Sequence, residues 1–291
     1  MGPALGIKVR RTRGGRGLRH ISISLALALL TGPAWAQTQQ DWGSCAEAES
    51  SNDQRIAGCT AVIESGDRSS SDLAISYNNR GTAYDNKGLP DHAIADYTKA
   101  IALKSDYAHA YGGRAAAYYD KGLYDQAIAD DTRAIELKPD FAAAYNDRGN
   151  AYDEKGLYDQ GIADYTQAIA LQSDYASAYN GRGTAYDRKG LHDQAIADYT
   201  KAIALQSDYA HAYYNRAWAF HLKGEDARGL PDAERAVALA PNVANSIETR
   251  AEIYERLGRR EDAIAGYRTS LKIDPTDQSA KRGLIRLGAT P

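Results

Sequence analysis

The sequence predicts an all-α fold made of stacked helical hairpins, and three observations support this prediction. The strongest is a repeated unit, because residues 176–209 match residues 142–175 almost letter for letter after a shift of 34 positions. Within the unit, apolar residues recur at the spacing of amphipathic helices. The composition, 43% hydrophobic and 25% charged, is typical of a folded protein rather than a disordered one. We therefore expect one elongated array rather than two separate domains.

Each unit is expected to form two helices joined by a tight turn. With Ala176 counted as position 1, helical spacing extends over residues 179–186 and again over 195–205. Gly190 lies between them at position 15, where glycine can adopt the positive φ that ends a helix. The pair Ser207-Asp208 offers side-chain oxygens that can cap the next helix. The unit is thus an αα-hairpin, which buries its apolar face only by stacking on its neighbours.

Small, aromatic and glycine residues recur at fixed positions of the unit. Residues are small at positions 8, 20 and 27, mostly Tyr at 4, 11 and 24, and Gly at 15 in every unit. This pattern resembles the tetratricopeptide repeat, and the resemblance implies a right-handed superhelix whose first helices line a concave surface. It covers residues 74–277 as six units: 74–107, 108–141, 142–175, 176–209, 210–243 and 244–277.

Three positions depart from the family pattern. Asp131 and Ala233 replace the aromatic residue at position 24. Pro231 falls inside the expected second helix of the fifth unit, where a proline is tolerated only near a helix start. That helix is therefore expected to begin about two residues late.

Residues 1–36 have the pattern of a secretory signal peptide. Six basic residues precede the apolar run 21–30, and Ala34-Trp35-Ala36 predicts cleavage before Gln37. The run is too short to span a bilayer, so no membrane insertion is expected after cleavage. The protein is thus expected to be a bacterial exported repeat protein, periplasmic or secreted. Taking these six from the 35 basic residues leaves 29 against 38 acidic, a formal charge of −9, which argues against a nucleic-acid partner.

The two ends of the array are expected to be capped. Residues 37–73 predict an N-terminal capping hairpin and linker, in which Cys59 occupies aromatic position 24 of the second helix and Cys45 lies on the first. An exported chain with only these two cysteines predicts a Cys45–Cys59 disulfide; the alternative is two buried thiols in contact. Residues 278–291 predict a C-terminal capping helix and tail.

Arginine at position 7 and aspartate at position 23 predict a ladder of structural ion pairs. A partly buried guanidinium needs a carboxylate or carbonyl partner. The pairs can form within or between units, and the alternative is Arg lying over Tyr rings with its head in water. Arg250 is expected to find another partner, because position 23 of its unit is Gly266. The predicted structural residues are Arg80, Arg114, Arg148, Arg182, Arg216, Asp96, Asp130, Asp164, Asp198 and Asp232.

No pattern in the sequence indicates catalysis. No Ser, His and Asp residues have the spacing of a known catalytic triad motif. The glycines are interpreted as turn residues rather than a phosphate-binding loop, and the histidines as surface residues. We therefore expect no enzyme, no catalytic residue, no metal and no cofactor.

The remaining prediction is a binding surface along the first helices of the units. The family resemblance assigns positions 2, 5, 9, 12 and 13 to it, with position 6 beside them. Asn side chains both donate and accept, so they can hold a peptide backbone, while Tyr and Trp supply flat apolar contacts. The acidic balance favours a neutral-to-basic protein or peptide. Alternatives are binding on the convex side or at an end, and a structural, self-associating subunit of an envelope assembly. The predicted partner-binding residues are Asn78, Asp85, Tyr119, Asn146, Asn150, Asp153, Asn180, Asp187, Tyr214 and Trp218.

Overall fold

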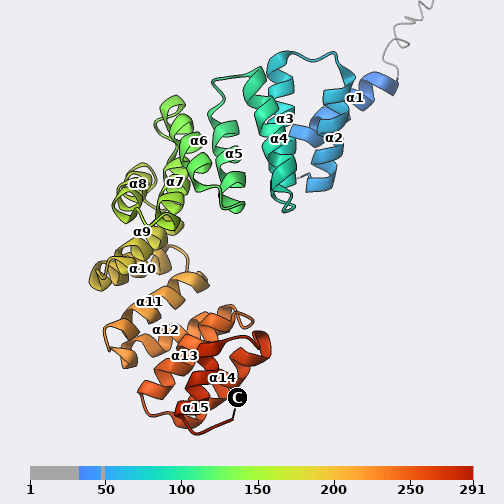
Figure 1. The fold of residues 1–291 in the computed structure, drawn as a ribbon. Coiled ribbons are helices and arrows are strands. Elements are labelled where there is room, and N and C mark those ends of the chain that lie inside the picture. The colour runs from blue at the N-terminus through green and yellow to red at the C-terminus, as the bar shows by residue number, and fades with distance from the viewer. Residues whose placement is uncertain (1–32, 47–49, 291) are drawn as a thin grey trace, which may run out of the picture.

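A computed structural model describes residues 33–46 and 50–290, and these form fifteen α-helices. Figure 1 shows them stacked along one curved path from the N-terminal hairpin to the C-terminal helix. The helices are α1 Pro33–Ala46, α2 Asn52–Ser65, α3 Ser70–Asp85, α4 Pro90–Leu103, α5 Ala108–Asp120, α6 Tyr124–Leu137, α7 Ala142–Glu154, α8 Tyr158–Leu171, α9 Ala176–Arg188, α10 His192–Leu205, α11 Ala210–Leu222, α12 Asp226–Leu239, α13 Ala244–Arg256, α14 Arg260–Ile273 and α15 Gln278–Arg286.

The helices pack as antiparallel pairs, and the pairs stack in chain order. The most extensive contacts join the two helices of each hairpin, from α1 with α2 to α13 with α14. The first helices of successive hairpins also touch one another along the whole array, from α1 with α3 to α13 with α15. Among the described residues, the second helices of successive hairpins do not touch. The first helices therefore form the shorter, concave side, as the predicted superhelix requires.

The N-terminal region is only partly described. Residues 1–32, most of the predicted signal peptide, lie outside the described residues. Helix α1 begins at Pro33 and continues through the expected cleavage position between Ala36 and Gln37. Helix α3 begins at Ser70, four residues before the first 34-residue unit, and its N-cap Ser69 accepts a hydrogen bond from the backbone of Asp72.

The glycine at position 15 follows the first helix of every unit and has the positive φ that the sequence predicts. Gly190 has a φ of 75°, and its equivalents in the other five units lie between 69° and 75°. The predicted Ser207-Asp208 cap is wrong, because the N-cap of α11 is Tyr209 and no side chain caps it. Backbone bonds close this connection instead, from the Tyr209 N–H to the Gln206 carbonyl at 3.2 Å.

The late start predicted for α12 is also wrong. The helix begins at Asp226, the same unit position as its equivalents, with Pro231 inside it. Pro231 lacks the N–H that would bond the carbonyl of Ala227, and both residues are exposed. Water can hydrogen-bond that carbonyl, so the proline does not delay the helix.

The seam between units depends on a tyrosine packed against glycines. The ring of Tyr165 is 1% exposed and lies between Gly149 of its own unit and Gly181 of the next. A Cβ at Gly149 would lie 2.8 Å from this ring, and one at Gly181 would lie 2.6 Å from it. Glycine therefore lets the two backbones approach the ring.

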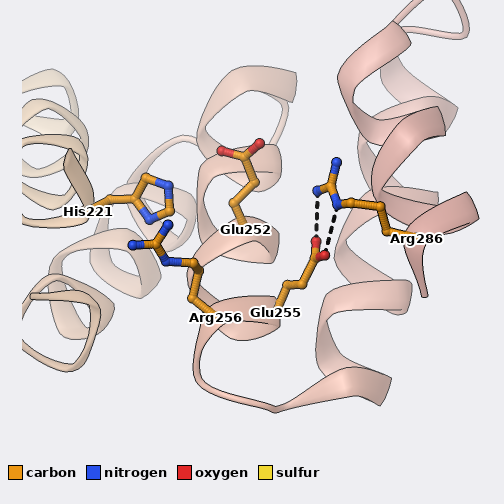
Figure 2. Close-up of a pocket in the computed structure, with 5 residues that line it drawn as sticks. All are labelled: His221, Glu252, Glu255, Arg256 and Arg286. Atoms are coloured by element: carbon orange, nitrogen blue, oxygen red, sulfur yellow. Dashed lines mark hydrogen bonds and ion pairs between the residues drawn. The ribbon is translucent and has the colours of Figure 1, made fainter. Parts of the chain in front are cut away.

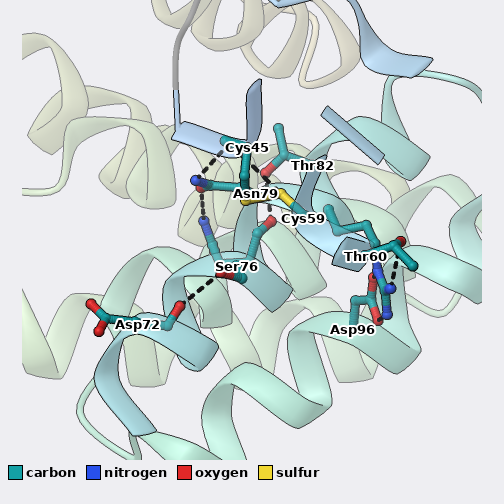
Figure 3. Close-up of a disulfide and its surroundings, with 10 residues drawn as sticks. Cys45, Cys59, Thr60, Asp72, Ser76, Asn79, Thr82 and Asp96 are labelled. Atoms are coloured by element: carbon teal, nitrogen blue, oxygen red, sulfur yellow. Dashed lines mark hydrogen bonds and ion pairs between the residues drawn. A yellow bond between two sulfur atoms is a disulfide. The ribbon is translucent and has the colours of Figure 1, made fainter. Parts of the chain in front are cut away.

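Both ends of the array are closed by packing. The structure contains the Cys45–Cys59 disulfide, and Asn79 of α3 donates to the Cys45 carbonyl at 3.2 Å, joining the hairpin to the first unit (Figure 3). At the other end, Ala280 and Leu284 of α15 are fully buried against Tyr267. The last hairpin thus has its apolar face covered.

Candidate partner-binding groove

A row of buried ion pairs fixes the spacing of the hairpins. In five units, the position 7 arginine donates from Nε at 2.7 Å and from Nη2 at 2.8 or 2.9 Å to one carboxylate of the same unit. Its Nη1 donates to a threonine of the preceding hairpin at 2.9–3.1 Å. The ion pairs are therefore within units, while threonine links the units. The pairs are Arg80–Asp96, Arg114–Asp130, Arg148–Asp164, Arg182–Asp198 and Arg216–Asp232.

Arg250 is the exception that the sequence indicates. Its Nε is buried without a hydrogen-bond partner, and its guanidinium lies 5.8 Å from the ring centre of Tyr254. An aspartate cannot replace Gly266 without movement, because a Cβ there would lie 2.8 Å from the Cβ of Ala251. Close helix packing therefore removes the carboxylate from this unit.

Three hollows lie along the first helices. The hollow between α5 and α7 has a volume of about 180 Å³ and is lined by Ala116, Tyr119, Asp120, Asp147 and Asn150. A second, of about 160 Å³, includes Tyr214 and His211 of α11. The third, of about 490 Å³, lies between α11, α13 and α15. Most of their lining comes from unit positions 2, 5, 6, 9, 12 and 13, and we call this surface the concave groove.

The large hollow carries both signs of charge. It is lined by His221, Glu252, Glu255, Arg256 and Arg286 (Figure 2). Arg286 of α15 donates to both oxygens of Glu255 at 2.9 Å, while the Glu252 carboxylate stands apart from this pair. The sequence-derived site residues did not include these five. Three of them could have been identified from the repeat pattern, because Glu252, Glu255 and Arg256 occupy positions 9, 12 and 13 of the sixth unit.

The asparagines predicted to hold a peptide are largely bonded within the protein. Asn146 is only 5% exposed and donates to Asp147 at 3.0 Å. Asn150 accepts a hydrogen bond from the Tyr165 hydroxyl at 2.8 Å, and Asn180 accepts one from the Asn215 amide at 3.0 Å. Asn78 donates to Asn79 at 3.3 Å. The amides therefore bond mainly to side chains of the protein itself, while the Oδ1 atoms of Asn78 and Asn146 are buried and accept no hydrogen bond.

The predicted acids and aromatics differ in access. Asp153 is 5% exposed, and an oxygen of the Asp187 carboxylate lies 2.5 Å from His192 Nδ1. Asp85, Tyr119, Tyr214 and Trp218 are half-buried. Tyr119 and Tyr214 each line a hollow, and the Trp218 ring lies 5.3 Å from that of His221, which lines the large one. The aromatics are thus the predicted residues best placed for a partner.

Burial raises the pKa of several carboxyl groups behind the groove. Desolvation raises the pKa of Asp153 to about 7, opposed by the nearby Arg188. Burial also raises the pKa of Asp147, and it raises that of Asp131 well above the usual range, with Asp147 adding to the effect. At low pH these carboxyls are therefore neutral and leave the groove less acidic.

Among residues 33–46 and 50–290, no group of three His, Cys, Asp or Glu is arranged to hold a metal ion. Over the same described part of the chain, every helix is too short or too polar to cross a bilayer.

Comparison with known proteins gives a consistent family assignment. Models described as tetratricopeptide repeat match residues 74–107, 146–208, 182–244 and 244–277, and one described as TPR repeat matches residues 115–156. Together they cover most of the predicted array. None of the curated proteins compared with this chain matches it.

Solved structures share the fold at low sequence identity. A chain of the Cut9–Hcn1 hetero-tetramer of the APC/C superposes with a TM-score of 0.69 and 21% identity, over 81% of this chain and 49% of that one. Thus our chain matches about half the length of that protein. PilF of Pseudomonas aeruginosa superposes with a TM-score of 0.67 and 14% sequence identity, over 75% of this chain and 100% of that one. YrrB, described as a TPR protein with an unusual peptide-binding site, superposes with a TM-score of 0.51 and 20% sequence identity, over 64% of this chain and 96% of that one.

Proposed function

The chain belongs to the tetratricopeptide repeat family, and we propose from this that it is a non-enzymatic scaffold that binds an extended protein segment in its concave groove. Arrays of this family are generally non-enzymatic and bind proteins or peptides. The observation that carries the proposal is the line of three hollows along α5, α7, α11, α13 and α15. A segment lying across successive first helices would contact several hollows at once.

The side chains of the groove favour a neutral-to-basic segment. Asp120, which lines the first hollow, and Glu154 are exposed. Glu252 lines the third hollow and accepts a hydrogen bond from Ser279 at 3.5 Å. Arg188 and Arg256 oppose them, but each lies near an acid of the protein, Glu154 at 3.8 Å and Asp226 at 3.2 Å. Net negative potential attracts a basic partner and weakens as salt is added. The half-buried Tyr119, Tyr214 and Trp218 supply apolar anchors.

We place this activity in the periplasm or outside the cell. The basic and apolar segments of residues 1–36 support export, as does the disulfide, which persists in oxidising compartments. Sequencing the N-terminus of the mature protein tests this: export predicts that it starts at Gln37, and a chain that keeps residues 1–36 in the cytoplasm contradicts the proposal.

Site-specific photo-crosslinking in intact cells tests the groove. A photoreactive phenylalanine analogue replaces Tyr119 or Tyr214 in the groove. The matched control carries the analogue at Leu171 of the outer helix α8, a residue that is 38% exposed. We expect adducts with one partner from the two groove positions and none from Leu171. Mass spectrometry should map both groove crosslinks to one extended stretch of that partner. Adducts only from Leu171 move the site to the convex side, and adducts only between copies of this chain support self-association instead.

A further inference from the structure

In three units the tyrosine at position 24 packs against a glycine at position 6 of the following repeat. A Cβ added to Gly113, at position 6 of the following unit, would lie 2.5 Å from the ring of Tyr97, and Gly181 and Gly283 stand in the same relation to Tyr165 and Tyr267. The hydroxyls of Tyr97 and Tyr165 reach position 9 of their own units, Thr82 at 3.2 Å and Asn150 at 2.8 Å. The Tyr267 hydroxyl instead donates to Glu255, at position 12, at 2.6 Å. The ring thus fills the space between positions 6 and 9.

The second unit differs at all three positions together. Asp131 replaces the tyrosine, Asp147 replaces the glycine of the next unit, and Ala116 occupies position 9. The hollow of about 180 Å³ lies at this place, with Ala116 and Asp147 both in its lining. The space that a tyrosine ring fills elsewhere is therefore partly open here and has acidic walls.

Asp131 makes no hydrogen bond through either carboxyl oxygen, although its side chain is 1% exposed. Because it occupies the helix position of the tyrosines, its side chain points in their direction, toward Asp147. Asp147 itself accepts a bond from Asn146 and therefore already has a donor. A buried carboxyl without a donor is costly, so this place lacks a hydrogen-bond donor that a ligand can provide.

We propose that this hollow receives a lysine side chain of the segment bound in the groove. The inference rests on the proposed function and names one chemical feature of the partner. An ammonium group carries three donors and one positive charge, which suits Asp120 and Asp147 in the lining of the hollow and the buried Asp131 close to Asp147. The apolar stem of the lysine can lie along Ala116 and the Tyr119 ring, which line the entrance. A compact ammonium also suits a hollow of this size better than the planar guanidinium of arginine.

Titration of Asp131 gives the site a pH dependence. Burial is the largest cause that raises its pKa; Asp147 of α7, Asp130 of α6 and Asp164 of α8 add to it, while Arg148 of α7 opposes it. Burial therefore favours the neutral form of the Asp131 carboxyl when no cation is bound beside it. An ammonium ion favours the carboxylate, so binding releases a proton and must strengthen as the pH rises.

The test uses n-butylammonium chloride as a lysine side-chain probe on the mature protein labelled at its alanine methyl groups. The Ala116 methyl signal reports on the hollow. We expect a saturable shift of this signal in the millimolar range at pH 8 and at least tenfold weaker binding at pH 5. Equal concentrations of n-butanol, ethylguanidinium chloride or sodium chloride should produce a much smaller shift. An equal response to butanol or a stronger one to ethylguanidinium overturns the proposal.

A refilled variant provides the control for the site. Asp131→Tyr combined with Asp147→Gly restores the pair found as Tyr97 with Gly113 and Tyr165 with Gly181, so we expect it to fold with an unchanged helical circular dichroism signal. It should lose the butylammonium response. If it keeps that response, the amine binds elsewhere and the inference is wrong. The groove crosslinks from Tyr214 are a separate readout: if they persist while butylammonium never binds, the lysine site fails and the proposed function stands.

Discussion

Arg148 donates two hydrogen bonds to the carboxylate of Asp164, from Nε at 2.7 Å and from Nη2 at 2.8 Å, and a third to Thr132 at 3.0 Å. The arginine side chain is 16% exposed and the aspartate 9%. The bidentate geometry raises the pKa of Arg148, mainly through the hydrogen bonds to Asp164. One guanidinium therefore holds together the two helices of its own hairpin and the second helix of the preceding one.

Removing this arginine should destabilise the array strongly. Arg148→Ala leaves Asp164 buried without its partner, and breaking such a pair costs about 3–5 kcal/mol. We expect a lower urea midpoint, with the loss of amide protection concentrated in α6, α7 and α8. Arg250→Ala is the matched control, because Arg250 has the same unit position and no partner for its Nε. Comparable losses in the two variants would show that the arginine stems, rather than the ion pairs, stabilise the array.

Removing the disulfide should destabilise the N-terminal hairpin and leave the repeats folded. Cys45 and Cys59 are 14 residues apart, and closing a loop of this size contributes about 3 kcal/mol in the chain-entropy model. The Cys45→Ala/Cys59→Ala variant should lose hydrogen-exchange protection in α2, whereas α5 to α14 stay protected. Two free thiols in the unreduced wild-type protein, or unchanged protection of α2 in the variant, would contradict this.

The buried Asp153 predicts that stability falls as the pH rises. Burial raises its pKa to about 7, from about 4 in the unfolded chain, so between these values the folded state binds the extra proton. Unfolding then becomes easier as the pH rises through this window, and the effect levels off above about pH 7. Asp153→Asn should reduce the difference between the urea midpoints at pH 5 and pH 8. Burial also raises the pKa of Asp131, so part of the pH dependence of stability should remain in the Asp153→Asn variant.

The exposed Asp140 provides the control for that titration. Asp140→Asn removes the same charge without removing a buried carboxyl, and the difference between the two midpoints should match the wild type. An equal reduction in both variants would assign the slope to total charge.

Adding one methyl group at Gly181 should destabilise the seam between the third and fourth units. Its Cβ would lie 2.6 Å from Cε1 of Tyr165, a ring that is buried and bonded to Asn150. Overpacking of this kind costs about 1–3 kcal/mol, which exceeds the gain from replacing a helical glycine by alanine. Thermal unfolding of Gly181→Ala measures it. Gly112→Ala makes the same change where the added Cβ would lie 3.3 Å from its nearest neighbour, the Phe141 ring, so it should change stability much less. An equal effect in the two variants would contradict the role of the Tyr165 ring.

The period, the six hairpins and the turn between the two helices of each hairpin could be predicted from the sequence, because they depend on local patterns. Gly190 at position 15 predicts the αL turn, and it has that conformation since only glycine adopts it without strain. Pro231 was misjudged for a tertiary reason: its helix position is exposed, so the missing bond is left to water rather than to the protein.

The sequence alone determined that arginine and aspartate recur together, whereas only the tertiary structure decided how they pair. A spacing of 16 residues joins Arg148 to Asp164 in its own unit and, in the other direction, to Thr132 of the preceding one. The same limit applied to the groove. The sequence placed Asn146 and Asn150 on the correct helix, but a helix position does not specify whether an amide bonds to a neighbour or faces a partner. That is decided when the helices pack, because Asn146 then bonds to Asp147 and Asn150 to Tyr165 of the paired helix.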